Sequence, residues 1–95
     1  MNLRDEARGR DCTVRLPGIC NFNPETSVLA HGKLAGISGM GLKVPDLMGA
    51  IACSACHDEI DGRTRKLERD FVRLSFFDGM MRTLNIWISE GFVTW

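Results

Sequence analysis

The longest regular pattern of apolar and polar positions covers residues 67–90. Apolar side chains recur there at steps of three or four, the spacing that places them on one face of an α-helix. The stripe that we expect to be buried consists of Phe71, Leu74, Phe77, Met81, Leu84 and Ile88. Gly91 follows as a residue typical of the C-terminal end of a helix. The pattern therefore predicts one long amphipathic helix packed on the rest of the chain.

Two shorter apolar segments earlier in the chain predict a β-hairpin followed by a helix. Residues 26–31 form a short apolar run that ends at His31, and residues 50–53 form a second one, so each is expected to be a strand. A helix is expected to begin at Ser54 and to end at Gly62, because glycine readily adopts the conformation that closes a helix. Together with the long helix, these elements predict a small α+β domain.

The segment between the two predicted strands, residues 32–45, is rich in glycine, with Gly32, Gly36, Gly39 and Gly41. It is expected to be a long loop with Lys33 and Lys43 near its two ends. Such a loop could bring both lysines to a phosphate backbone, or it could be a plain connection between the strands. Asp46, directly after Pro45, is expected to cap a brief helical turn before the second strand.

The chain has 95 residues and no net formal charge at pH 7, with a sequence pI of about 6.7. This length fits one domain, with a core expected over residues 12–65 and the packed helix over residues 66–91. The overall charge gives no argument for nucleic-acid binding, but basic residues gather locally. They are Arg4, Arg8, Arg10 and Arg15 in one run and Arg63, Arg65, Lys66, Arg69 and Arg73 in the other. Acidic residues are interspersed in both runs, so solvated surface charge and phosphate contact both stay open.

No apolar run approaches the ~18 residues that span a bilayer, and the N-terminal segment is charged. We therefore expect no membrane association and a cytoplasmic location. Thiols in the cytoplasm are kept reduced, so the four cysteines are not expected to form disulfides. Metal binding then becomes the leading explanation for these cysteines.

The cysteines occur in two pairs, Cys12 with Cys20 and Cys53 with Cys56. The second pair has the Cys-x-x-Cys spacing, and the turn signal Pro17-Gly18 is expected to bring the first pair together. Four thiolates from two chain segments suit a tetrahedral, structural zinc ion with no open position for a substrate. Buried reduced cysteines and a redox dithiol are the two alternatives to zinc.

The chain has two histidines, and both lie where the predicted elements could bring them together. His31 ends the first predicted strand, and His57 directly follows the Cys-x-x-Cys pair. His57 and Asp61 are four residues apart, so a helix would place them on one face with Cβ atoms about 5–6 Å apart. A metal ion or a phosphate could lie between these two side chains.

A strand ending in His, a loop, and Cys-x-x-Cys-His opening a helix together resemble the zinc-knuckle branch of the HNH endonucleases, which have the ββα-metal fold. More narrowly, the chain is similar to the YbcO-like nucleases encoded by lambdoid phages and prophages. The similarity rests on RLPGICN, NPETSVLAH, PD and ACSACHDEID at residues 15–21, 23–31, 45–46 and 52–61. It continues more weakly around residues 79–80 and 86–87, and covers essentially the whole chain.

The resemblance implies a metal-dependent DNA endonuclease. His31 matches the general base of the HNH motif, which would activate a water molecule for attack on a phosphodiester. His57 matches the metal ligand on the helix and Asp61 a second ligand one turn later, with Mg²⁺ or Mn²⁺ as the expected ion and zinc as an alternative. Asp46 is the candidate for the middle residue of the motif, which is usually Asn; Asn21 and Asn23 are alternatives.

The implied substrate is DNA, with Lys33, Lys43, Arg63 and Arg65 as candidate contacts to it. The implied setting is DNA recombination or processing encoded by a phage or prophage, in the cytoplasm of the bacterial host. Phage recombination proteins are candidate partners, and a homo-oligomer is left open. Many HNH enzymes carry another metal ligand just before the general base, where this chain has Ala30.

Two other classes of function remain as alternatives. The first is a non-catalytic zinc-binding module that binds DNA or a phage recombination protein, which would use the cysteines but neither histidine for chemistry. The second is a structural adaptor protein, which the neutral net charge favours. A second metal ion near His57, away from the cysteines, would distinguish the nuclease from the zinc-binding module. The structural adaptor is expected to show no salt-dependent binding of DNA.

Overall fold

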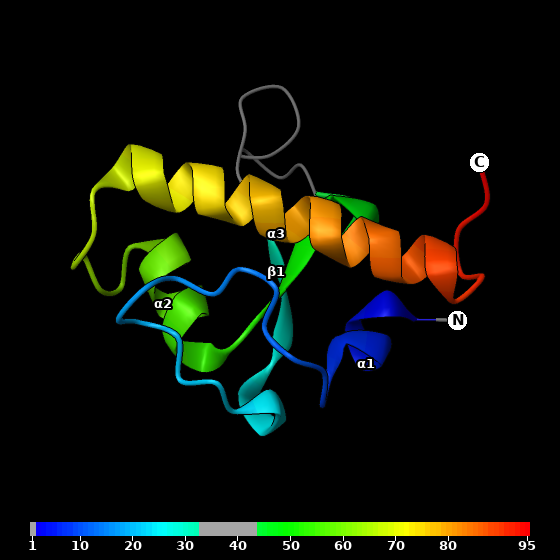
Figure 1. The fold of residues 1–95 in the computed structure, drawn as a ribbon, viewed down its shortest axis with the longest axis horizontal. Coiled ribbons are helices and arrows are strands. Elements are labelled where there is room, and N and C mark those ends of the chain that lie inside the picture. The colour runs from blue at the N-terminus through cyan, green and yellow to red at the C-terminus, as the bar shows by residue number, and fades with distance from the viewer. Residues whose placement is uncertain (1, 33–43) are drawn as a thin grey trace.

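A short hairpin and several small helices are covered along one side by a single long helix (Figure 1). The computed structural model describes residues 2–32 and 44–95 of the chain. In chain order, the elements are α1 (Leu3–Ala7), the 3₁₀ turn η1 (Pro24–Thr26), β1 (Val28–His31), the 3₁₀ turn η2 (Asp46–Met48), β2 (Gly49–Ala52), α2 (Ser54–Asp61) and α3 (Arg69–Ser89). The predicted α+β class is confirmed. The predicted glycine-rich loop, with Lys33 and Lys43, lies almost entirely outside the described residues.

The two strands form the predicted antiparallel hairpin. In its register, Leu29 lies opposite Ile51, and His31 lies opposite Gly49. β1 begins later than predicted because Thr26 belongs to the 3₁₀ turn that precedes the strand. His31 is nevertheless the last residue of β1, as predicted.

α2 begins directly after β2, and both of its ends have identifiable caps. Cys53 is the N-cap rather than the last strand residue, and its Sγ accepts a hydrogen bond from the backbone N–H of Cys56. Gly62 ends the helix as predicted, in the left-handed conformation with φ of 80°. Its N–H donates to the carbonyl of Asp58, which satisfies an acceptor of the last turn. The cysteine pair is therefore built into the junction between strand and helix.

The predicted buried stripe of α3 is wrong. The helix buries Val72, Phe76, Gly79, Thr83 and Trp87 instead. Phe71 is 44%, Leu74 66%, Phe77 38% and Met81 66% exposed. The prediction failed because α3 has apolar residues on two sides, and because the side that faces the core includes a glycine and a threonine, which an apolar periodicity does not detect.

These small and polar residues allow α3 to approach the hairpin closely. A Cβ atom at Gly79 would lie 2.8 Å from Val14 Cγ2 and 3.1 Å from Val14 Cα, so the position has room only for hydrogen. Thr83 Oγ1 accepts a hydrogen bond from the backbone N–H of Ile51 at 3.0 Å and lies 3.0 Å from Thr13 Oγ1. The threonine hydroxyls therefore join α3 to β2 by buried hydrogen bonds.

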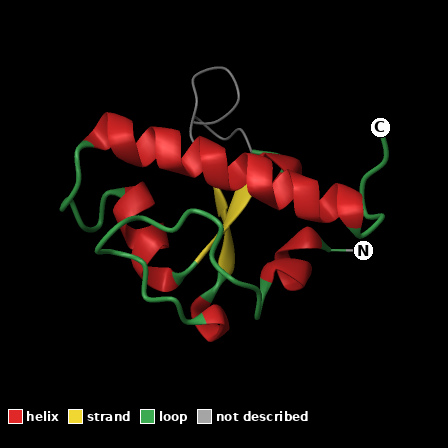
Figure 2. Cartoon of the chain, in the orientation of Figure 1, coloured by secondary structure: helices red, strands yellow, loops and turns green. Residues whose placement is uncertain are grey.

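Figure 2 shows α2 beneath the first turns of α3 and α1 beneath its last turns. At the α1 end, the fully buried Trp87 packs with Ala7, Leu29 and Ile51. The Arg10 guanidinium lies 5.1 Å from the centre of the Trp87 ring. In the part of the chain that the structure describes, no helix is both long enough and apolar enough to cross a bilayer.

Candidate active site and metal centre

The four cysteines meet in one cluster, as predicted. Cys12 and Cys20 come from the loop before η1, Cys53 follows β2, and Cys56 lies in the first turn of α2. Their sulfur atoms all lie within 4.8 Å of one another, and the Sγ atoms of Cys20 and Cys53 are 3.8 Å apart. A tetrahedral zinc ion with Zn–S bonds of about 2.3 Å requires sulfurs about 3.8 Å apart. The cluster therefore fits a zinc ion, and all four residues are free thiols rather than disulfides.

Backbone N–H groups point at the sulfur atoms of this cluster. The N–H groups of Arg15 and Cys56 donate to Cys12 Sγ and Cys53 Sγ, each at 3.4 Å. Arg15 adopts the left-handed conformation, with φ of 52°, although it has a side chain. That conformation is unfavourable by roughly 1–2 kcal/mol for such a residue. Donors of this kind stabilise thiolates in metal sites, so the strained turn supports the metal-binding interpretation.

Without a metal ion the four thiols cannot all ionise. The pKa of the Cys12 thiol is lowered to about 4, mainly because the Cys56 side chain hydrogen-bonds to it. The pKa of Cys20 is raised to about 11, mainly by burial. The pKa of Cys56 is also raised, first by its interaction with Cys12. A divalent cation would remove this mutual repulsion and allow all four groups to act as thiolates.

His31 is held by a carboxylate from the segment that precedes β2. Its Nε2 lies 2.7 Å from Oδ1 of Asp46. The same oxygen accepts a hydrogen bond from Nε of Arg4, in α1, at 3.2 Å. The hydrogen bond with His31, and then the contact with Arg4, lower the pKa of Asp46. Asp46 is the first residue of η2, and its side chain does not cap that turn as predicted, because it is engaged with His31 and Arg4.

His57 and Asp61 form a second pair of imidazole and carboxylate, on α2. Their Nε2 and Oδ2 atoms are 3.2 Å apart, which confirms that the spacing of four places them together. Arg63 extends from the end of the helix, with Nη2 at 3.8 Å from Asp61 and Nη1 at 3.2 Å from Asp58. Arg63 and Arg65 are both exposed. Two ligand atoms on adjacent octahedral positions of Mg²⁺ would lie about 3.0 Å apart, so this pair fits one edge of such a site.

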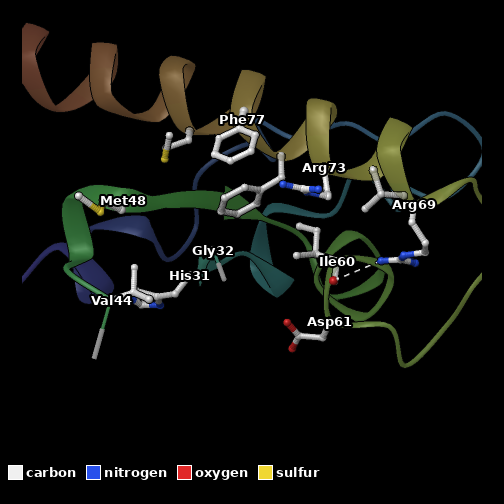
Figure 3. Close-up of a pocket in the computed structure, with 12 residues that line it drawn as sticks. His31, Gly32, Val44, Met48, Ile60, Asp61, Arg69, Arg73 and Phe77 are labelled. Atoms are coloured by element: carbon white, nitrogen blue, oxygen red, sulfur yellow. Dashed lines mark hydrogen bonds between the residues drawn. The ribbon is translucent and has the colours of Figure 1, made fainter. Parts of the chain in front are cut away.

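A pocket of about 450 Å³ lies between the hairpin, α2 and α3. It is lined by His31, Gly32, Val44, Met48, Ile60, Asp61, Arg69, Val72, Arg73, Phe76, Phe77 and Met80. Figure 3 shows Arg73 and Phe77 extending from α3, with His31 and Asp61 on the opposite wall. The pocket therefore joins two of the predicted site residues. The other two, Asp46 and His57, reach it through their contacts with His31 and Asp61.

The two histidine pairs do not complete a metal cage by themselves. Within residues 2–32 and 44–95, the four cysteines form the one group of three or more potential ligands that are close enough to share an ion. Ala30, before His31, is buried in the core and offers no ligand. His57 and Asp61 therefore provide two ligands, and other oxygen atoms would have to complete the coordination of an ion held there.

Glu59 is a buried residue of the site that the sequence did not single out. Its carboxylate accepts hydrogen bonds from the hydroxyl of Thr64 at 2.5 Å and from the backbone N–H groups of Lys66 and Leu67, each at 2.9 Å. Arg69 Nη2 donates to the Glu59 carbonyl at 2.7 Å. Glu59 thus fixes the connection from α2 to α3 and places Arg69 at the pocket. A glutamate between helical residues carries no signal of this role.

Replacing Glu59 by glutamine is expected to lower the Tm by more than ~10 °C, because an amide group would face backbone donors and leave Arg69 without its anion. Thermal unfolding of the zinc-loaded protein measures the effect. The exposed Glu25→Gln variant is the matched control and is expected to melt like wild type. An unchanged Tm for Glu59→Gln would show that the connection holds without the charge.

The difference in Tm between wild type and Glu59→Gln is expected to depend on pH. Hydrogen bonds, first that from Thr64, lower the pKa of Glu59 below its ordinary value of 4.5. The folded state therefore binds this proton less tightly than the unfolded state, so the contribution to stability is complete above pH 4.5 and is lost as the pH falls through the lowered pKa. The Tm difference should narrow below that pH, while loss of zinc in acid affects both proteins.

Comparison with known proteins identifies a family, two relatives and a solved structure that are similar to this chain. The family described as "Putative nuclease YbcO" matches residues 1–92. "Putative nuclease YbcO" of Escherichia coli (strain K12) and "Putative nuclease ybcO" of Enterobacteria phage 82 are each 55% identical over 92 residues, which cover 97% of this chain and 96% of the relative. The solved structure "Structure of a putative bacteriophage protein from Escherichia coli str. K-12 substr. MG1655" has a TM-score of 0.83 and 51% identity, covering 95% of this chain and 100% of that one. The chain therefore belongs to the family described as "Putative nuclease YbcO".

Proposed function

We propose that this protein is a metal-dependent DNA endonuclease of the HNH type, in which His31 activates the attacking water. One observation carries the proposal: His31 and Asp61, from separate elements, line the same pocket, and each belongs to a pair of imidazole and carboxylate. The family's name supports nuclease activity, and the order of hairpin and helix beside a cysteine cluster supports the HNH type. The relative from Enterobacteria phage 82 supports a role in phage or prophage DNA recombination or processing within the host cytoplasm.

The hydrogen bond of His31 determines which of its nitrogen atoms can accept a proton. The Asp46 carboxylate only accepts hydrogen bonds, so Nε2 of His31 carries the hydrogen of the 2.7 Å contact. In the neutral form of the ring, Nδ1 is then the unprotonated nitrogen. An imidazole nitrogen in this state can take a proton from water near neutral pH, as a general base must. Asp46 is thus a positioning residue that fixes the tautomer and the ring orientation of His31.

The remaining site residues would bind the DNA phosphates and a divalent ion. His57 and Asp61 would hold Mg²⁺ or Mn²⁺, which when bound supplies positive charge to stabilise the developing negative charge on the phosphate and the leaving oxygen. Arg63 and Arg65, both exposed beyond α2, can contact the DNA backbone near this pair. Lys33 and Lys43 belong to the same proposal but lie outside the described residues.

Cleavage of supercoiled plasmid and of single-stranded DNA by purified, zinc-loaded protein tests the proposal. Cutting is expected when Mg²⁺ or Mn²⁺ is added and not when both are omitted; omission is preferable to EDTA, which would also remove the structural zinc. Zinc content and circular dichroism, measured in the same samples, show that the protein is intact. If folded protein binds DNA in a salt-dependent manner but does not cut it under any condition, the non-catalytic zinc-binding module is the better description.

The Asp46→Asn variant is expected to cut DNA about 10–100-fold more slowly, because an amide can present a hydrogen donor to His31 and no longer fixes its tautomer. The loss should appear in kcat, with KM for DNA unchanged, since Asp46 is not expected to contact the substrate. Arg4→Ala is the matched control, because it removes the other partner of Asp46 while leaving the carboxylate on His31. Equal losses in both variants would contradict a positioning role for Asp46.

A further inference from the structure

α3 carries a second apolar face that the folded chain leaves exposed. We call it the outer stripe; it consists of the exposed Leu74, Phe77 and Met81 and continues at the half-buried Leu84 and Ile88. Leu74 and Met81 are each 66% exposed and Phe77 is 38% exposed. The core lies against a different side of the helix, at Val72 and Phe76. A helix that packs on its own chain through one face usually has polar residues on its other faces, so large exposed apolar side chains there indicate another contact.

The spacing of the outer stripe is that of a coiled-coil seam. Its residues follow one another at steps of three and four, so Leu74, Met81 and Ile88 occupy a positions and Phe77 and Leu84 occupy d positions of a heptad repeat. A repeat of seven keeps these side chains on one line along the helix, where a second helix can pack. The fully buried residues of α3 are a separate set, so they lie on a different side of the helix from this seam.

We propose that two copies of this chain associate through their outer stripes, with the two α3 helices parallel. The flanking charges select this arrangement. Arg73 precedes Leu74 at a g position, and Asp78 follows Phe77 at an e position. In a parallel pair, each Arg73 faces Asp78 of the other copy, whereas an antiparallel pair brings g positions to g positions and sets like charges together.

Two further observations fit this pairing. Arg73 and Asp78 are both exposed, and neither takes part in an ion pair within residues 2–32 and 44–95. The seam also adjoins the pocket, because Phe77 belongs to the outer stripe and lines the pocket as well. A second copy seated on the stripe would therefore border the proposed active site.

The seam is short, which sets the expected strength of the dimer. From Leu74 to Ile88 it covers about 22 Å of helix at 1.5 Å per residue. We expect a dissociation constant of roughly 1–100 µM, so the chain should be a monomer in dilute solution and a dimer when concentrated. The proposal goes beyond nuclease activity and is tested by mass alone, so its failure would leave the proposed function untouched.

Sedimentation equilibrium of the zinc-loaded full chain, from ~1 µM to ~1 mM, is the decisive measurement. Wild type is expected to shift from monomer to dimer over this range. The double variant Leu74→Gln, Met81→Gln is expected to remain folded, because both side chains are largely exposed, and to remain a monomer at all concentrations. Leu47→Gln, at a 44% exposed apolar position in η2, is the matched control and should dimerise like wild type.

The charge pair tests the parallel arrangement. Arg73→Asp is expected to raise the dissociation constant about tenfold, and adding Asp78→Arg to the same chain should restore it, because the exchanged charges again face each other. A wild-type chain that stays monomeric to ~1 mM would overturn the dimer. A dimer that persists in the glutamine variant would show that the contact lies elsewhere. If neither charge variant changes the dissociation constant of the dimer, the parallel pairing is refuted.

Discussion

Replacing His31 by alanine is expected to lower the rate of DNA cleavage by about 10²–10⁴-fold, the usual contribution of a general base. His31 is the last residue of β1 and lines the pocket, and its Nε2 lies 2.7 Å from Oδ1 of Asp46. Single-turnover cleavage with protein in excess measures the chemical step without product release. Zinc content and the thermal unfolding curve of the variant should match those of wild type.

His57→Ala distinguishes the base from the metal ligand. Loss of a ligand weakens the binding of the ion, so more Mn²⁺ should restore a large part of the activity of His57→Ala. The same addition should have no effect on His31→Ala, because the missing group accepts a proton. Arg8→Ala, at an exposed position that does not line the pocket, serves as the surface control and should cut normally. A His31→Ala protein that cuts as fast as wild type would remove His31 from the mechanism.

The parts of the fold that could be predicted from the sequence are those fixed by local chemistry. Gly62 could be predicted to end α2, because glycine readily adopts the positive φ that closes a helix. Its φ in the structure is 80°. The two cysteine pairs were predicted to lie together because one metal ion would bind all four. Their sulfur atoms do lie within 4.8 Å of one another. His57 and Asp61 had to be neighbours once residues 54–61 were helical. Each prediction needed only a spacing and one geometric rule.

The orientation of α3 could not be predicted in the same way. Apolar periodicity identifies a face that can be buried, and α3 has two such faces. The choice between them depends on a contact distant in sequence, where the backbone at Gly79 approaches Val14 and the hydroxyl of Thr83 meets that of Thr13. Small size and hydroxyl pairing, rather than hydrophobicity, decide which side of the helix faces β2. Much of the apolar face that was predicted to be core is exposed, at Leu74, Phe77 and Met81, and it is the face that we propose to bind a second copy of the chain.

The reactive groups of the candidate site could be predicted from the sequence, but the residues that surround them and hold them in place could not. His31, His57 and Asp61 stood out because imidazole and carboxylate groups beside a cysteine pair suggest metal and acid–base chemistry. Arg4 could not be linked to Asp46 from the sequence, since 42 positions separate them. Arg69 and Arg73 were recognised only as members of a basic run, although their spacing of four places both on one side of α3 and at the pocket.

Removing the metal from the cysteine cluster is expected to unfold most of the protein. The cluster joins the loop before η1, the end of β2 and the first turn of α2, and a structural zinc ion contributes about 10–16 kcal/mol to folding in small domains, which exceeds the net stability of many chains of this size. Circular dichroism during titration with a chelator should show loss of helix together with release of zinc, and added zinc should reverse it. Cys56→Ser should be largely unfolded even with zinc present.

Cobalt substitution identifies the ligands independently of activity. Four thiolates around Co²⁺ in a tetrahedral site should give intense visible absorption bands, which should weaken when any one cysteine is changed to serine. Ser54→Ala, at an exposed residue between the cysteine positions, is the matched control; it removes one exposed hydrogen bond from Asn21 but no thiolate, so it should keep the full spectrum. A metal-free protein with the same Tm as the zinc-loaded form would contradict a structural role. The buried thiols would then be holding the loop and α2 together by packing alone, as the side chains of Leu16 and Val72 do in the same cluster.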